Sequence, residues 1–278
     1  MKRCLPASIS IFWLFFALFS ASSAVAGADP RVELSAGGEY SSFKLSDGST
    51  STIWYAPFSA RLDVGNWTFR ATVPYISITA PGNLIVLLDD DPTGAGVGGN
   101  GQSQTAGPIR TVSGIGDSSL SATYSFDDIK GSPLYVDLGA RVRLPTGNAR
   151  EGTGVGATDY GLQSEVGLDL DRWGIALNGG RRFLGQVNGL DRVDGWQAGT
   201  DAWLNLGPHA LVGLYYDWRN ASEPGLSNPR DAGVYLSYRL NRRWKMRVEA
   251  SRALDLPQAN YTVGLRLYWR LQERRDHH

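Results

Sequence analysis

The sequence predicts an all-β fold, a transmembrane antiparallel β-barrel of about twelve strands with short periplasmic turns and long external loops. Three observations predict it. Apolar residues alternate with polar ones along most of the chain, short connections between these runs alternate with long ones, and aromatic residues gather at both ends of the runs. Together they are typical of strands with one face in lipid and the other on a polar lumen.

The first residues are typical of a secretory signal peptide. Lys2 and Arg3 precede an apolar run at 9–19, and a stretch of small residues then ends at Ala26. The apolar run is shorter than the roughly 20 residues that a membrane-spanning helix needs. We therefore expect a bacterial outer-membrane protein with a signal peptide at 1–26, an outer-membrane β-barrel at 27–271 and a C-terminal tail at 272–278.

The composition favours strands over helices for crossing the membrane. The mean hydropathy is −0.22, too polar for a bundle of membrane helices, and no second apolar stretch approaches the length of a spanning helix. Acidic and basic residues number 27 each, so the formal net charge is zero. This balance argues against a nucleic-acid partner and for charges that pair within the protein.

The alternation defines each expected strand in turn. In one clear case Leu134, Val136 and Leu138 share one face, while Asp137 and Arg141 share the other. Runs of this kind are about as long as the 9–11 residues that a tilted transmembrane strand needs. We place strands near 31–43, 52–63, 67–78, 115–127, 133–144, 159–171, 173–184, 194–206, 209–219, 231–241, 244–254 and 260–271.

The connections support the same architecture. Short turns are expected near 65–66, 129–132, 171–172, 207–208 and 241–243. Longer links, rich in Gly, Pro and Asn, are expected at 44–51, 79–114, 145–158, 185–193, 220–230 and 255–259. Outer-membrane barrels have short periplasmic turns and long external loops, so both termini are expected on the periplasmic side.

Aromatic residues mark two expected membrane interfaces. Those near the short turns or the C-terminal end of the barrel are Trp67, Trp173, Trp244 and Trp269. Those near the long links are Trp54, Tyr75, Tyr160, Trp196, Trp218 and Tyr261. The competing interpretation is a soluble sandwich or barrel that buries these rings in its core, but such a fold gives no reason for aromatic girdles at both ends.

The polar face supplies the candidate residues of a solute path. Opposite the apolar face, the lumen is expected to receive Glu39, Arg61, Arg70, Asp117, Asp137, Arg141, Arg143, Glu165, Arg182, Asp201, Asp217, Arg239, Arg247, Glu249 and Arg266. From this set we select Arg141, Arg143, Arg247 and Arg266, with Asp137, Glu165 and Glu249 as counter-charges. Two interpretations stay open: ion pairs that brace the barrel, and a selectivity ladder for a polar or charged solute.

Part of the chain resembles a known family. The resemblance is carried by Gly114–Asp117, Leu120–Tyr124, Leu144–Gly147, Gly152–Gly154 and Thr158–Gly161. These motifs resemble the outer-membrane family named for the meta-pathway of phenol degradation, and they cover roughly residues 113–183. The resemblance implies a barrel that moves aromatic or other hydrophobic compounds, and it carries no catalytic residues. Many such barrels end on an aromatic residue that the assembly machinery reads, whereas this chain continues past Leu271.

We therefore expect a passive outer-membrane channel for small molecules, aromatic or hydrophobic compounds included, and no enzyme. The expected partners are outer-membrane lipid, a small-molecule solute and the outer-membrane assembly machinery. The chain has three histidines, and none lies near the external rim, so a Ser-His type of lipase is not expected. We expect no catalytic residue, no cofactor and no metal, because the acidic run 89–91 lacks the spacing of a calcium loop.

Two alternative functions remain at this point: a non-conducting structural or surface-display barrel with a sealed lumen, and a lipid-modifying enzyme of the outer membrane. The sequence leaves open the identity of the solute, the oligomeric state, gating, and whether the link 79–114 folds into the mouth as a plug.

Overall fold

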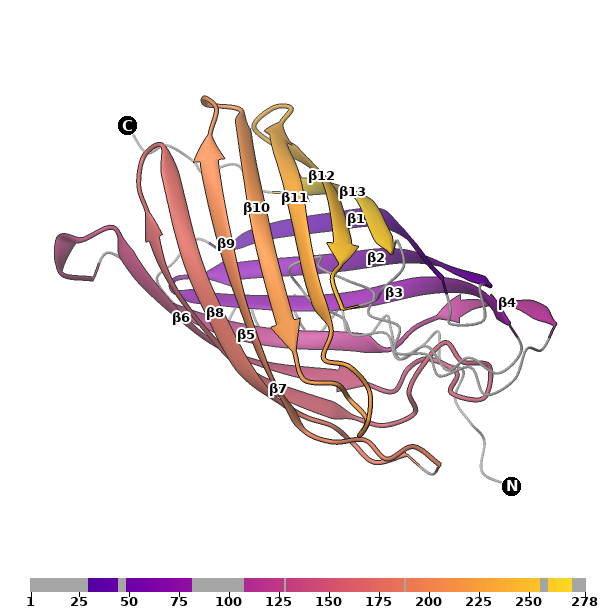
Figure 1. Cartoon of the computed structure of the whole chain (residues 1–278). Coiled ribbons are helices and arrows are strands. Elements are labelled where there is room, and N and C mark those ends of the chain that lie inside the picture. Colours follow the sequence, from indigo (N-terminus) through magenta and orange to yellow (C-terminus); the bar gives the residue numbers. More distant parts are fainter. Residues whose placement is uncertain are drawn as a thin grey trace, which may run out of the picture.

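The computed structural model describes residues 30–44, 49–81, 108–127, 129–187, 189–255 and 260–271. These residues form a closed antiparallel barrel in which β1 pairs with β13. Figure 1 shows the strands inclined across the barrel, with short hairpin turns at one end and longer connections at the other. Among the described residues, no helix is both long and apolar enough to cross a membrane.

The strands have the following bounds: β1 (Arg31–Lys44), β2 (Thr50–Val64), β3 (Trp67–Pro81), β4 (Ile109–Ile115), β5 (Ser118–Phe126), β6 (Leu134–Leu144), β7 (Asp159–Asp169), β8 (Trp173–Phe183), β9 (Gly195–Asn205), β10 (Ala210–Arg219), β11 (Arg230–Arg239), β12 (Trp244–Ala253) and β13 (Tyr261–Arg270). A single turn of 3-10 helix (Ile129–Gly131) lies between β5 and β6.

These thirteen segments, within the described residues, occupy twelve positions around the barrel, as predicted. The extra segment arises because β4 and β5 share one position. β4 pairs with residues 75–81 of β3, and β5 pairs with residues 67–72 of the same strand. Gly116 and Asp117 separate the two segments, and Gly116 keeps the chain attached by donating its N–H to the Pro74 carbonyl at 2.9 Å.

Two predicted strand boundaries near this interruption were wrong. The strand expected near 115–127 begins at Ile109, so the final residues of the expected link 79–114 belong to β4. β3 also continues to Pro81, three residues beyond its expected end at 78. The rest of that link, together with the predicted signal peptide and the C-terminal tail, lies outside the described residues.

The outer surface of the barrel is apolar in the period-two pattern that defined the strands. On β7, Tyr160, Leu162 and Val166 are about half exposed, whereas Asp159 and Gly167 between and beside them are buried. The predicted girdle residues Trp54, Trp67, Trp173 and Trp196 are also exposed. Since soluble proteins rarely leave a continuous apolar surface of this kind, the exterior is that of a barrel surrounded by lipid.

The turns at one end of the barrel are as short as predicted. Val64 pairs directly with Trp67 across Gly65 and Asn66, and Gly65 has a φ of 56°. This left-handed conformation carries little steric cost for glycine, which lacks a Cβ. The asymmetry between short turns and long connections places the long connections on the outside of the cell.

Candidate functional site

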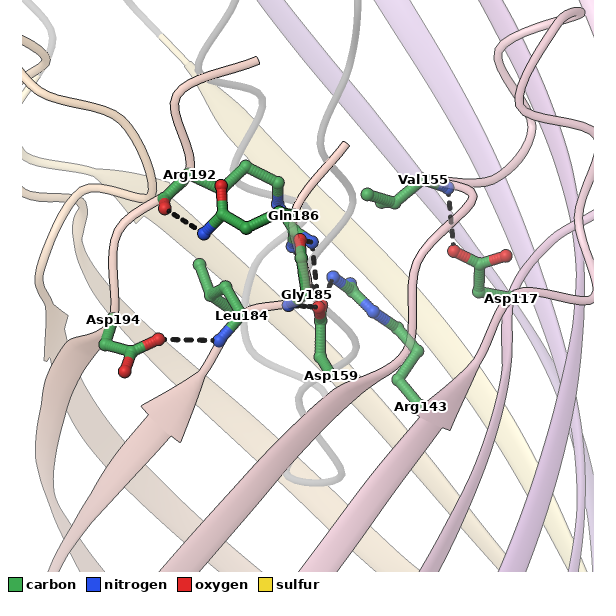
Figure 2. A network of polar contacts seen from close by, with 9 residues as sticks. All are labelled: Asp117, Arg143, Val155, Asp159, Leu184, Gly185, Gln186, Arg192 and Asp194. Carbon is green, nitrogen blue, oxygen red and sulfur yellow. Dashed lines mark hydrogen bonds and ion pairs between the residues drawn. The ribbon is translucent and has the colours of Figure 1, made fainter. Parts of the chain in front are cut away.

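Charged side chains gather at two depths along the inner wall, on strands β6 to β12 and on the connections beside them. The first group lies at the external end of the strands, where the long connections begin, and we call it the rim network. It comprises Asp117, Arg143, Asp159, Gly185, Arg192 and the segment 145–158. Figure 2 shows how these residues converge from separate strands and connections.

Asp159 is the most heavily bonded carboxylate of the rim network. Its two oxygens accept hydrogen bonds from Nη1 and Nη2 of Arg192, each at 2.8 Å. Arg143 of β6 also forms an ion pair with it, and the Gly185 N–H donates to Oδ1 at 2.9 Å. The side chains of Asp159 and Arg192 are 8% and 1% exposed. A carboxylate saturated in this way holds the 185–193 connection against the end of β7.

Asp117 holds the neighbouring connection in a similar manner. Its carboxylate accepts the N–H of Gly147 at 3.0 Å. It also accepts the N–H of Val155 at 2.8 Å (Figure 2). Thr146 adds a bond from its hydroxyl to the carbonyl of Gly116 at 2.9 Å. The segments that carried the family resemblance, around Gly116, Thr146 and Asp159, therefore meet in one place. They fasten the 145–158 connection to the interruption between β4 and β5.

A small pocket lies beside the rim network on the lumen side. It holds about 70 Å³ and is lined by charged residues of both signs. These are Arg141, Arg143, Asp159, Arg182, Asp217, Arg219 and Asp231. Asp217 and Asp231 are register partners on β10 and β11, while Arg182 donates to the Asn220 carbonyl at 2.6 Å. The lining is thus a mixture of opposite charges that are already engaged with protein groups.

The second group lies deeper, near the middle of the strands, and we call it the lumenal aromatic pocket. Its lining includes Glu165, Asn178, Asp201, Trp203, Tyr215, Asp217, Tyr235 and Arg247. The cavity holds about 210 Å³, more than the rim pocket. Because Asn178 and Asp217 line both cavities, the two lie at successive depths along the same wall.

Glycines create the space for the rings of this pocket. A Cβ added to Gly213 of β10 would collide with the ring of Tyr235, and one added to Gly233 of β11 would collide with the ring of Tyr215. The two rings therefore lie flat over glycines of the neighbouring strand. Gly174 leaves room for Trp203 in the same way. This packing keeps the rings against the wall and turns their faces toward the lumen.

Hydrogen bonds orient the polar groups of the pocket. The Tyr235 hydroxyl donates to Asp201 at 2.8 Å, and the Tyr135 hydroxyl donates to Glu165 at 2.8 Å. The guanidinium carbon of Arg247 lies 3.8 Å from the centroid of the Tyr235 ring, and its Nε donates to Glu249 at 3.0 Å. The pocket therefore holds carboxylates bonded to tyrosine hydroxyls, with one guanidinium of the protein on the face of the Tyr235 ring.

The residues selected from the sequence lie in these two sites or close to them, and Arg266 forms an ion pair with Glu39 outside both pockets. Arg141 and Arg143 line the rim pocket, and Arg247 and Glu165 line the lumenal aromatic pocket. Arg266 is the register partner of Arg247 and donates to Glu39 at 2.5 Å. Glu249 accepts from Arg247, and Asp137 is the register partner of Glu165 on β6 and β7.

Several important residues were not selected from the sequence. Asp159 and Arg192 were missed because they are 33 positions apart and only the folded connection joins them. Tyr215, Tyr235 and Trp203 were missed because they carry no charge, and only charged residues of the polar face were expected to line the lumen. A signal was available, since Tyr215 and Tyr235 occupy the same alternating positions as Asp217 and Asp231.

The part of the inner wall formed by β1 to β3 is apolar, unlike the wall that holds the two pockets. Near the external end of β1 to β3, the buried residues Phe43, Ile53, Tyr55, Ile76, Ile78 and Ala80 form an apolar cluster. They occupy the positions that alternate with the exposed Trp54 and Tyr75, so they belong to the inner face. The lumen thus has one wall with apolar residues and another with charged and aromatic residues. Among the described residues, no group of three or more His, Cys, Asp or Glu side chains could hold a metal ion.

Comparisons with known proteins bear on the fold. The sequence matches no protein-family model and no curated protein. The structure is similar to that of an outer membrane channel from Pseudomonas putida F1, with a TM-score of 0.63, 10% identity, and coverage of 88% of this chain and 96% of that chain.

Two porins are similar to a lesser degree. For the NanC porin the TM-score is 0.56 at 7% identity, covering 85% of this chain and 98% of that chain. For the KdgM porin in complex with disordered oligogalacturonate, the TM-score is 0.51 at 10% identity, with coverage of 85% and 98%. Identities this low show the fold alone, which is that of bacterial outer-membrane channels and porins. The resemblance to the phenol meta-pathway family stays a prediction.

Proposed function

We propose that this protein is a passive outer-membrane channel for small molecules, aromatic or hydrophobic compounds included. The observation that carries the proposal is the pair of cavities at successive depths on one inner wall, which mark a route from the external rim toward the middle of the barrel. Charged residues of both signs and aromatic faces line this route, while an apolar cluster lies on the other wall. Such a lining suits a solute that has both an apolar and a polar part.

The proposal assigns the solute path to the residues of the inner wall selected above. Arg141 would meet the solute at the rim beside Arg143, whose ion pair with Asp159 holds that part of the path in place. Glu165 and Arg247 would meet the solute in the lumenal aromatic pocket. Arg266, Asp137 and Glu249 would set the charge of the surrounding wall. No catalytic step is assigned. The partners in this proposal are the solute, the outer-membrane lipid around the barrel, and the machinery that inserts it.

Single-channel conductance of the refolded chain without residues 1–26 in planar bilayers tests the proposal. We expect discrete open steps, and we expect benzoate on one side to reduce the current because the arginines of the rim pocket attract an aromatic acid at the mouth of the barrel. A matched preparation that has been heat-denatured controls for bilayer leakage. A correctly folded barrel that inserts and carries no current would contradict the channel and favour a sealed structural barrel.

A further inference from the structure

We propose that the lumenal aromatic pocket binds small organic cations, such as a protonated amine or a quaternary ammonium group carried on an aromatic ring. This inference rests on the proposed channel function and names a solute class for one of its sites. It is carried by three features of the pocket: its charge, the orientation of its rings, and the position of Arg247.

The charge of the pocket is negative. Glu165 from β7, Asp201 from β9 and Asp217 from β10 line the cavity, and Arg247 from β12 is the one basic side chain in the described lining. Two further carboxylates lie close by: Asp137 opposite Glu165, and Glu249 bonded to Arg247. Because the pocket lies inside a barrel wall, where charges are screened less than at an open surface, this excess attracts a cation and disfavours an anion.

The rings add a second attraction for a cation. Tyr215 and Tyr235 lie flat over Gly233 and Gly213, so they present their faces to the cavity. The two rings are 6.5 Å apart between centroids and inclined by 29°. The face of an aromatic ring carries negative electrostatic potential, and a cation within about 6 Å of its centre is stabilised. Asp201 accepts a hydrogen bond from the Tyr235 hydroxyl at the edge of this ring, and its negative charge adds to the same preference.

Arg247 shows that the site accommodates a cationic group. Its guanidinium lies 3.8 Å from the centre of the Tyr235 ring and borders the cavity. A solute cation would approach the same face and would compete with this guanidinium. The cavity of about 210 Å³ is far larger than the space that one water molecule needs, so it has room for a small organic group.

The rim pocket does not share these features. Its carboxylate Asp159 accepts bonds from two arginines and one backbone N–H, and its arginines outnumber its carboxylates in the described lining. The preference for organic cations is therefore assigned to the deeper pocket.

Binding of benzyltrimethylammonium to the refolded barrel in non-ionic micelles, measured by calorimetry, tests the inference. Benzyl alcohol and benzoate are the neutral and anionic comparison probes. We expect the cation to bind about tenfold or more tightly than benzyl alcohol, and benzoate to bind least, because charge and ring faces act together. Equal binding of the cation and the alcohol would overturn the proposal.

Two substitutions locate the site. Asp201→Asn should weaken cation binding about fivefold to tenfold, since it removes one adjacent charge while keeping an acceptor for Tyr235. Asp63→Asn is the matched control: Asp63 also faces the lumen but pairs with Arg61 near the short turns, and its substitution should leave binding unchanged. An equal effect of both substitutions would exclude the pocket. If Asp201→Asn does not fold, Asp217→Asn replaces it with the same expectation.

Arg247→Gln should change the affinity for the cation in the opposite direction. Removing the competing guanidinium should tighten binding of benzyltrimethylammonium about threefold or more, since the pocket becomes more negative and the Tyr235 face is cleared. Weaker binding in this variant would contradict the competition. Binding in micelles does not require conduction, so the two proposals can fail separately. If the barrel binds the cation but does not conduct, the binding site is supported and the channel function is contradicted. If it conducts but does not bind the cation, only the binding site is contradicted.

Discussion

The rim network and the lumenal aromatic pocket use the same kinds of residue for different purposes. Both combine arginines and carboxylates on the inner faces of neighbouring strands. At the rim, Asp159 and Asp117 accept several N–H donors each and are buried. In the deeper pocket, Glu165 and Asp201 each accept a hydrogen bond from one tyrosine hydroxyl and border open space.

This difference shows how to tell a structural charge from a solute-facing one within a single barrel. A structural carboxylate accepts several hydrogen bonds, whereas a solute-facing carboxylate accepts few and borders a cavity. The residue type and the strand face are the same in both cases. Of the two interpretations left open by the sequence, bracing ion pairs fit the contacts of Asp159 with Arg143 and Arg192 at the rim. A selective lining is our proposal for the deeper pocket.

The largest effect is expected from breaking the rim network. Asp159→Ala leaves Arg143 and Arg192 buried together without their shared carboxylate, which should destabilise the barrel by about 3–5 kcal/mol. The midpoint of urea unfolding in micelles, followed by tryptophan fluorescence, measures this loss. Asp171→Ala, in the exposed β7–β8 turn, is the control and should change stability by less than about 0.5 kcal/mol. Similar midpoints for the two variants would show that Asp159 is not a brace.

The second effect concerns the connection that Asp117 holds. Asp117→Ala removes the acceptor of the Gly147 and Val155 N–H groups, at a cost of about 1–3 kcal/mol for each buried donor left unsatisfied. The 145–158 connection should then open more often, and trypsin should cleave after the exposed Arg150 faster than in the unchanged protein. Arg150→Gln in the same background should abolish that cleavage. An unaltered cleavage rate would mean that the other contacts of this connection suffice.

The third effect is on conductance and tests whether the Tyr235 ring can obstruct the lumen. Gly213→Leu should force the Tyr235 ring off the wall and into the lumen, and lower the single-channel conductance about twofold, since a twelve-stranded barrel has a narrow interior. Adding Tyr235→Ala should restore most of the current, because the double variant has no ring to displace. If the double variant conducts no better than Gly213→Leu, the ring is not the obstruction.

The smallest effect is expected where a lumenal ion pair is partly exposed. Arg61 and Asp63 form a pair at 2.8 Å, with side chains 39% and 30% exposed. Arg61→Gln should therefore change the free energy of unfolding by less than about 1 kcal/mol. The same urea titration measures it. A loss as large as that of Asp159→Ala would refute burial as the factor that ranks these ion pairs.

Much of the fold could be predicted from the sequence, and the site could be predicted only in part. The alternation at residues such as Leu162 and Val166 was enough to place the strands, because lipid on one side and a polar lumen on the other act on every strand separately. The split of one barrel position into β4 and β5 was not predicted. It depends on how Gly116 and Asp117 meet β3 and the 145–158 connection, which the local pattern does not encode.

The sequence by itself therefore determined the strand faces, the girdles of aromatic residues and the alternation of short turns with long connections, all of which follow from local periodicity. Only the tertiary structure decided that Arg192 reaches Asp159, that Arg266 pairs with Glu39 across 227 positions, and that Tyr235 lies over Gly213. The physical reason is that such neighbours depend on the register between strands and on the closure of the barrel. Those two properties are settled by all strands together.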